Sequence, residues 1–208
     1  MSNLTNIEKV RIALRYFLIG KGFTQALKAF DYAERLHTGL RKDGVTPSFH
    51  HQISIANYLT TLPLDNTALE TAIILAFLHD TPEDKGVSYE EIQTKFGDDI
   101  AHGSILLAKK YRGNDIPKEK YFGDLALHAM PALVKGADRM NNLSTMHGVF
   151  KIEKQQSYVD ETIAYHLPML KTARRNFPEY HMAFENVKIG ILAWVNSTQN
   201  YLNAMKQS

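Results

Sequence analysis

The sequence predicts an all-α protein, a compact bundle of many helices. Apolar residues recur at helical spacing from the start of the chain, as in the run Val10, Leu14, Phe17 and Leu18. Helix-capping motifs, glycines and prolines interrupt the apolar runs at short intervals. No alternation of apolar and polar residues lasts long enough to indicate a β-strand. Such a bundle would gather its functional side chains from separated helices.

The first helices follow directly from the apolar spacing. After the opening helix, Phe23, Leu27 and Phe30 mark a second one. A third is expected from about Phe49 to Leu62, because Pro63 disfavours the helical conformation in the residue before it.

Two segments have the Ser/Thr-x-x-Glu form of a capping box, in which two side chains satisfy free backbone donors at a helix start. The first, Thr67 to Glu70, predicts a helix that runs to residue 80, with Pro82 at its end. The second, Ser88 to Glu91, predicts a short helix closed by Gly97.

The rest of the chain continues in the same manner. Pro168 should kink or split one of the later helices, because proline removes a backbone donor. Further helices are expected over about residues 98–110, 117–129, 131–146, 157–175 and 178–206. At 208 residues the chain is long enough for one well-buried core, so a single domain over residues 1–208 is expected.

The composition excludes several classes of function. A net charge of +2, from 24 basic and 22 acidic residues, does not indicate a nucleic-acid partner. The absence of cysteine excludes a disulfide framework, a thiol nucleophile and a cysteine-based zinc site. The amino terminus lacks the layout of a secretory signal, and the most apolar run, Thr71 to Leu78, is too short to span a bilayer. We therefore expect a cytoplasmic protein without a membrane partner.

Four residues of metal-binding type stand out: His51, His79, Asp80 and Asp138. Two imidazoles and two carboxylates suit a divalent ion such as Mn²⁺, Fe²⁺ or Zn²⁺, with positions left for water and substrate. The adjacent His79 and Asp80 can reach one ion only at a helix end, because neighbouring helical residues point about 100° apart. A solvated helix end is the alternative, and His50 competes with His51 as a ligand.

Acidic residues follow the His-Asp pair closely. Glu83 and Asp84 can orient or deprotonate a water, or protonate a leaving oxygen, although an acidic surface loop is the alternative. Asp138 lies on an otherwise apolar helical stretch and therefore needs a partner. That partner is either a metal ion or a salt bridge to Lys135 or Arg139.

Arg41 and Lys42 lie at the start of a turn-prone segment that continues to Pro47. A guanidinium can stack on a base and grip phosphate, and an ammonium adds a point charge. An exposed basic turn is the alternative for this pair.

Taken together, these motifs resemble the hydrolase domain of the RelA/SpoT family, within the HD-domain phosphohydrolases. The resemblance covers about residues 25–165 and is carried by segments 33–51, 76–84, 96–97 and 133–146. It implies an HD-type helical bundle with a central metal site. It also implies removal of the 3′-pyrophosphate from guanosine tetra- and pentaphosphate with Mn²⁺, another divalent metal being the alternative.

By position, four residues match the metal ligands of that family: His51 rather than His50, His79, Asp80 and Asp138. Glu83 and Asp84 match the acidic pair that handles the attacking water. Arg41 and Lys42 match residues that flank the base and phosphates.

The resemblance also implies that Asn142 contacts the ribose and that Thr145 lies near the 3′-phosphates. Asp138, Asn142 and Thr145 are spaced i, i+4 and i+7, so they share one helix face. The chain departs from the family at Ser48, where Tyr is usual, and at Asn141, where His or Tyr is common. Both departures bear on the nucleoside pocket more than on the metal.

A further departure is Gln52, which stands where the family has Pro after the metal-binding His. The chain also leaves no room for the synthetase and regulatory domains of long family members, so it resembles a stand-alone small alarmone hydrolase. The helices expected over residues 157–206 extend past the resemblance.

Three other interpretations stay open at this point. The same site could act as a phosphatase on a ribose 2′- or 3′-phosphate, such as that of NADPH, or as a nucleotidase on 5′-phosphates. Alternatively, the chain could bind a nucleotide without turnover or neutralise a toxin partner. A homo-oligomer is also compatible with the sequence.

Overall fold

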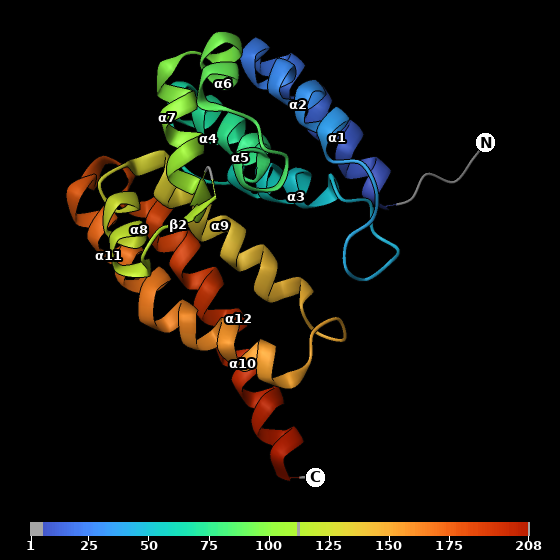
Figure 1. Ribbon diagram of the computed structural model, residues 1–208, viewed down its shortest axis with the longest axis vertical. Coiled ribbons are helices and arrows are strands. Elements are labelled where there is room, and N and C mark those ends of the chain that lie inside the picture. Colours follow the sequence, from blue (N-terminus) through green and yellow to red (C-terminus); the bar gives the residue numbers. More distant parts are fainter. Residues whose placement is uncertain (1–5, 112, 208) are drawn as a thin grey trace. The chain divides into compact units, whose positions relative to one another are not determined.

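Helices form nearly all of the chain in the computed structural model, which describes residues 6–111 and 113–207 (Figure 1). The all-α prediction is thereby confirmed, with one unpredicted addition. Strands β1 (Lys110–Tyr111) and β2 (Asn114–Asp115) pair antiparallel in a short hairpin. The chain divides into two compact units, the first ending at Asp115 and the second beginning at Ile116. The single domain expected over residues 1–208 stays a prediction.

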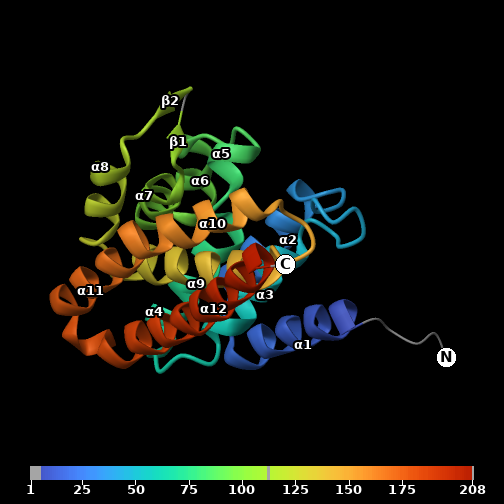
Figure 2. The same cartoon turned by 90° about the horizontal axis from the view of Figure 1, so that it is seen from below.

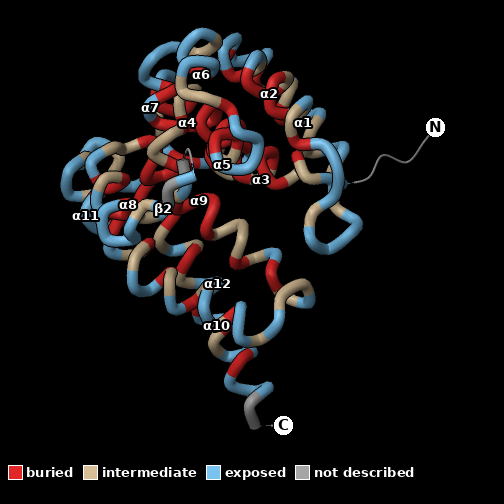
Figure 3. The backbone as a smooth tube through the Cα atoms, in the orientation of Figure 1, coloured by how far each residue is buried: buried red, intermediate tan, exposed pale blue. Residues whose placement is uncertain are grey.

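The first unit holds the helices that precede the hairpin. They are α1 (Asn6–Lys21), α2 (Thr24–Leu36), α3 (His50–Leu59), α4 (Asn66–Leu78), α5 (Thr81–Asp84), α6 (Tyr89–Phe96) and α7 (Asp98–Leu107). Helix α4 packs against α2, α3 and α7, and its residues from Ala72 to Leu78 are all buried (Figure 3). A helix that is apolar on every side must lie inside a core. This one is the centre of the first unit.

Aromatic contacts join the elements around α4. The ring centroid of Phe30 lies 5.2 Å from that of Phe49 and 5.4 Å from that of Phe77, both edge to face. Edge-to-face aromatic pairs contribute stability beyond the area that they bury. These three rings therefore anchor α2, the start of α3 and the end of α4 to one another.

The second unit holds the remaining helical segments. They are α8 (Lys118–Leu125), α9 (Ala129–Thr145), α10 (Ile152–Glu161), the π-helical turn η1 (Thr162–His166), α11 (Leu167–Asn176), the 3₁₀ turn η2 (Pro178–Tyr180) and α12 (His181–Gln207). Helices α9 and α12 run side by side in both views (Figures 1 and 2). Their apolar faces form much of this unit's core.

The predicted helix boundaries are right in some places and wrong in others. The side chain of Ser88 accepts a hydrogen bond from the Glu91 backbone N–H at 3.1 Å, and Gly97 closes α6 with a φ of 90°. Pro168 lies in the first turn of α11, directly after the π-helical turn, so the predicted split of that helix is confirmed.

The first capping box is placed wrongly. Asp65, not Thr67, caps α4, since its side chain accepts from the Ala68 N–H at 3.0 Å. Pro82 does not end α4 but lies in the first turn of α5, where proline is tolerated because that N–H needs no partner. Among the described residues, no helix is both long and apolar enough to cross a membrane.

Helix α9 crosses α11 and α12 closely at Gly136, and this glycine gives a test of packing in the second unit. A Cβ at Gly136 would lie 2.6 Å from Cγ1 of Val187 and 3.0 Å from Cδ2 of Leu170. We expect Gly136→Ala to lower the free energy of unfolding by about 1–3 kcal/mol, measured by urea denaturation.

The matched control is Gly123→Ala, on an exposed position of α8 where a Cβ would meet no described atom within 4 Å. This variant should leave stability unchanged or raise it by up to about 1 kcal/mol, because alanine is the better helix former. Equal stability of the two variants would contradict the close crossing.

Candidate metal centre

Three of the predicted ligands meet in the first unit. His51, His79 and Asp80 each offer one ligand atom, and these atoms lie within 4.8 Å of one another. Nε2 of His79 is 2.9 Å from Oδ2 of Asp80, and Nε2 of His51 is 3.8 Å from the same oxygen. Both histidines are buried, whereas Asp80 is partly exposed. The centre can therefore be reached from solvent on its carboxylate side.

A break between two helices brings adjacent residues to one point. Helix α4 ends at Leu78 and α5 begins at Thr81, so His79 and Asp80 form the joint between them. The Thr81 hydroxyl donates to the Leu78 carbonyl at 2.8 Å and satisfies one of the acceptors that the break leaves. The side chains of His79 and Asp80 can therefore converge, which those of adjacent residues inside one straight helix cannot do.

The contacts of His79 fix its tautomer. Its Nδ1 lies 2.8 Å from the Ala76 carbonyl oxygen, which can only accept, so Nδ1 carries the proton and donates. Nε2 is thereby directed to the side of Asp80 and His51. Metal-binding histidines commonly donate their second ring N–H to a carbonyl in this manner.

The donor set fits a divalent cation. Two imidazole nitrogens and a carboxylate oxygen suit Mn²⁺, Fe²⁺ or Zn²⁺ more than Mg²⁺ or Ca²⁺, which prefer oxygen ligands throughout. His51, His79 and Asp80 would hold such an ion. The rings of His51 and His79 lie with centroids 5.2 Å apart, close enough for both to face a single site.

The predicted acidic pair follows on α5, in the same unit. Oε2 of Glu83 accepts from the backbone N–H of Lys109 at 2.9 Å. The pKa of the Asp84 carboxyl is raised, first by loss of hydration and then by the negative charges of Asp80 and Glu83. The two acids therefore differ in environment: Glu83 is tied to a backbone N–H, and the charged form of Asp84 is disfavoured.

Arg41 and Lys42 lie in a well-defined loop, as their turn-prone context predicts. The Arg41 N–H donates to the Thr46 carbonyl at 2.7 Å. The Asp43 carboxylate accepts from the Thr46 hydroxyl and from the backbone N–H groups of Val45 and Thr46, which lowers its pKa to about 2. The loop is thus closed by its own side chain rather than by the basic pair.

Asp138 lies in the second unit, on α9, and is held by residues of its own helix. Lys135 Nζ is 2.9 Å from Oδ2, and the Asn142 side-chain amide donates to Oδ1 at 2.6 Å. The salt bridge to Lys135, one of the two alternatives for this carboxylate, is therefore present. A role for Asp138 as a metal ligand stays a prediction.

Arg139, the other alternative partner of Asp138, turns to a different network. Its guanidinium pairs with Glu161 and donates to Nε2 of His166 at 3.0 Å. His166 must accept this bond, so it is neutral with its proton on Nδ1. Sequence reasoning missed this buried network, because Glu161 and His166 are more than twenty positions away and carry no local motif.

Two further predicted residues are placed on α9. The shared face is confirmed for Asn142, which reaches Asp138 directly. Thr145 is exposed, and its hydroxyl donates to the Asn141 carbonyl at 2.9 Å. Their predicted contacts with ribose and phosphate stay predictions.

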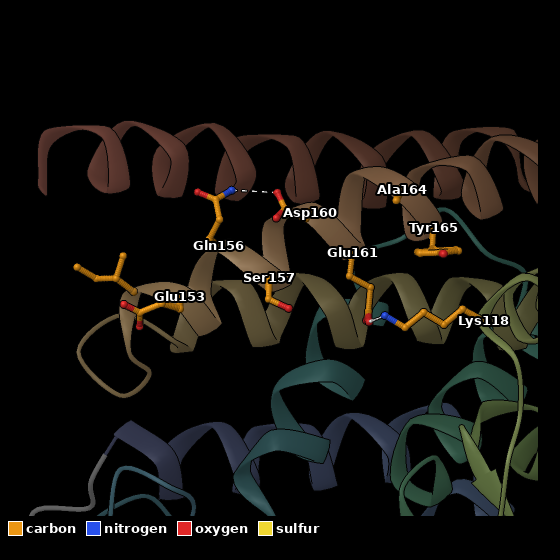
Figure 4. Close-up of a pocket in the computed structure, with 9 residues that line it drawn as sticks. Lys118, Glu153, Gln156, Ser157, Asp160, Glu161, Ala164 and Tyr165 are labelled. Atoms are coloured by element: carbon orange, nitrogen blue, oxygen red, sulfur yellow. Dashed lines mark hydrogen bonds and ion pairs between the residues drawn. The ribbon is translucent and has the colours of Figure 1, made fainter. Parts of the chain in front are cut away.

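A surface pocket of about 680 Å³ lies elsewhere in the second unit, along one face of α10. Figure 4 shows the Lys118–Glu161 ion pair at one end of it and the Gln156–Asp160 hydrogen bond at its edge. No residue of the predicted site lines this pocket. Its walls are chiefly apolar and acidic, which does not suit a phosphate ligand.

Comparison with known proteins identifies the class. Residues 29–104 match the HD domain family. This range contains His51 and the adjacent His79 and Asp80. The chain therefore carries an HD domain, the fold of a class of metal-dependent phosphohydrolases.

Within that class, the relatives are of the RelA/SpoT type, which confirms the resemblance. A probable GTP pyrophosphokinase of Mycobacterium leprae is 31% identical over 151 residues, 68% of this chain and 18% of the relative. A guanosine-3′,5′-bis(diphosphate) 3′-pyrophosphohydrolase of Aquifex aeolicus is 31% identical over 147 residues, 68% of this chain and 20% of the relative. The chain thus spans about a fifth of the length of these curated relatives.

A solved structure supports the fold. It is described as a metazoan ortholog of SpoT that hydrolyzes ppGpp and has a role in starvation responses. It superposes with a TM-score of 0.58 over 80% of this chain and 96% of its own, at 19% identity. The helical HD fold predicted for the chain is thereby confirmed.

The metal centre makes a prediction that is independent of any substrate. We expect His51→Gln to lower the affinity for Mn²⁺ by at least about tenfold, because it removes a ligand atom from the cluster. Isothermal titration of the metal-stripped protein would measure the change. His102→Gln, on the exposed side of α7, is the control and should bind Mn²⁺ as the wild type does. Equal loss in both variants would rule out the cluster as the site.

Proposed function

We propose that this protein hydrolyses guanosine tetra- and pentaphosphate, releasing pyrophosphate from the 3′ position and leaving GDP or GTP. The observation that carries the proposal is the joint between α4 and α5, where His79 and Asp80 meet His51 and the acidic pair follows on α5. A relative that is named for this reaction supports the choice of substrate.

We further propose Mn²⁺ as the metal, with Asp138 as a fourth ligand beside His51, His79 and Asp80. When bound, such an ion lowers the pKa of a water and polarises a phosphate oxygen. Asp138 is suited to the role because Lys135 and Asn142 already hold both of its oxygens in one orientation.

The acidic pair would divide the handling of the attacking water. Asp84, whose pKa is raised, would accept the proton that leaves the water. Glu83 is tied to the Lys109 N–H and would orient the water instead. Arg41 and Lys42 would offset charge on the phosphates, which is most of what phosphoryl transfer needs from a protein.

Hydrolysis is favoured over synthesis by the site itself. The proposed residues are metal ligands, carboxylates and cations, which are the groups that activate water and stabilise a leaving phosphate. Asn142 and Thr145 are proposed as contacts to the ribose and to the 3′-phosphates, from the face of α9 that they share with Asp138.

A second candidate keeps the site and changes the substrate. Ser48 and Asn141 replace the larger aromatic or imidazole side chains that are usual at these positions, which leaves more room for a different nucleoside. A ribose 2′- or 3′-phosphate, as in NADPH, would then be the substrate and orthophosphate the product.

Product analysis separates the two candidates. The metal-stripped protein would be incubated with guanosine tetraphosphate or NADPH, with and without added Mn²⁺, and the products resolved by anion exchange. We expect intact pyrophosphate and GDP from guanosine tetraphosphate only when Mn²⁺ is present. Release of orthophosphate from NADPH alone would instead support the second candidate, and turnover of neither would favour a nucleotide-binding or partner-binding protein.

The division of labour in the acidic pair is tested separately. We expect Asp84→Asn to lower kcat by about 10²- to 10⁴-fold, because it removes a general base while preserving shape. Glu83→Gln should bind Mn²⁺ and nucleotide and yet turn over slowly. Glu90→Gln, an exposed acid on α6, serves as the control. Wild-type kcat in Asp84→Asn would exclude it as the proton acceptor.

A further inference from the structure

The loop that carries Arg41 and Lys42 projects between the end of α2 and the start of α3 (Figure 1). Backbone contacts hold its two stems together. Leu40 and Pro47 form an isolated antiparallel bridge, and the Ser48 N–H donates to the Gly39 carbonyl at 2.9 Å. Most of the residues in this loop are exposed (Figure 3). Its geometry therefore depends on how its base is fixed.

Two buried side chains meet at that base. His37 is the C-cap residue of α2, and Gln52 lies in the first turn of α3. Nε2 of Gln52 is 3.4 Å from both ring nitrogens of His37. The two residues are 5% and 2% exposed, respectively. The contact therefore joins the two ends of the loop out of reach of competing water.

The chemistry of the pair suits a fixed contact. Burial lowers the pKa of His37 to about 4, so the imidazole is neutral at physiological pH and the pair is uncharged. Neutral buried groups can stay in contact without the hydration cost of a buried charge. The contact is also independent of the loop's own turn, which Asp43 closes.

Gln52 is not explained by stability alone. Its Oε1 is buried and has no hydrogen-bond partner among the described residues. A buried acceptor left in this state is unfavourable, and an apolar side chain of similar size would avoid the cost.

We propose that His37 and Gln52 form a clasp across the base of the loop, and that this clasp positions Arg41 and Lys42 for binding of the substrate phosphates. Both are positioning residues, since their effect on substrate passes through the loop. The second half of the proposal rests on the proposed function, whereas the clasp itself does not.

The test compares two buried glutamines. Gln52→Leu removes the clasp, and Gln155→Leu is its matched control in the second unit. Gln155 is equally buried at 2% exposure, also has an unpartnered Oε1, and also ties down a loop, through a 2.8 Å bond to the Phe150 carbonyl. The two variants should therefore lose similar global stability, which urea denaturation would verify.

Hydrogen exchange followed by NMR would report on the loop directly. In Gln52→Leu we expect exchange of the Arg41 and Ser48 amides to accelerate by about two- to tenfold, the range that one net hydrogen bond supports. Gln155→Leu should leave both amides unchanged. His37→Leu should match Gln52→Leu, and the double variant should be no faster than either, because both changes break one contact.

Kinetics would report on positioning. KM for guanosine tetraphosphate should rise by a similar factor in Gln52→Leu, with kcat within about twofold and Mn²⁺ affinity unchanged, because the loop and not the metal centre is loosened. Exchange no faster than in the Gln155→Leu control would overturn the clasp.

Other results would overturn the positioning role alone. Faster exchange with an unchanged KM would do so, as would a tenfold loss of Mn²⁺ affinity, which would show that Gln52 acts on His51. If the wild-type protein does not hydrolyse the nucleotide, the proposed function fails together with the positioning role. The exchange measurement would still decide whether the clasp exists.

Discussion

The break in the helix between Leu78 and Thr81 is the constraint on which the candidate site depends. Adjacent residues in a continuous helix diverge, so His79 and Asp80 could not share a ligand without it. Thr81 and Pro82 stabilise the break. The threonine hydroxyl donates to a carbonyl that the break leaves without a helical partner, and proline, which has no backbone N–H, leaves no unpaired donor in the next turn. Reactive side chains thus appear where regular structure stops.

The packing of the apolar helix α4 fixes the position of that break. Because its residues from Ala72 to Leu78 are buried, and because Phe77 packs against the rings of Phe30 and Phe49, its end cannot shift without disturbing the core. Phe49 also immediately precedes α3, which brings His51 to the same place. Packing of the first unit and placement of its metal-type ligands are therefore the same physical problem.

Much of this could be predicted from the sequence, and the remainder could not for identifiable reasons. Helical spacing and the Ser88 cap of α6 depend on local contacts, and both predictions are confirmed; the Glu91 side chain accepts from the Tyr32 hydroxyl. The cap of α4 was predicted wrongly because Asp65 and Thr67 lie two residues apart and both are capping residues by type. Only the register of the helix selects Asp65.

The partner of Asp138 illustrates a different limit. Lys135 and Arg139 flank it in sequence and both could reach it, but Arg139 is engaged by Glu161 and His166 of later segments. Because those residues are distant in sequence, the local pattern does not show which side chain pairs with Asp138. The contact between His37 and Gln52 was missed for the same reason, since the sequence showed Gln52 only as a departure from the family.

Two neighbouring carboxylates on one short helix need different surroundings if they are to have different roles. The Glu83 carboxylate accepts a hydrogen bond from the backbone N–H of Lys109. Asp84 lies close to Asp80 and Glu83, whose negative charges favour its protonated form. A divalent cation at Asp80 would weaken the repulsion between Asp80 and Asp84. Metal binding would therefore lower the pKa of Asp84 and make its carboxylate easier to ionise. A bound ion would also lower the pKa of its water. Under the proposed function, an ionised Asp84 beside such a water is the arrangement that general-base hydrolysis needs.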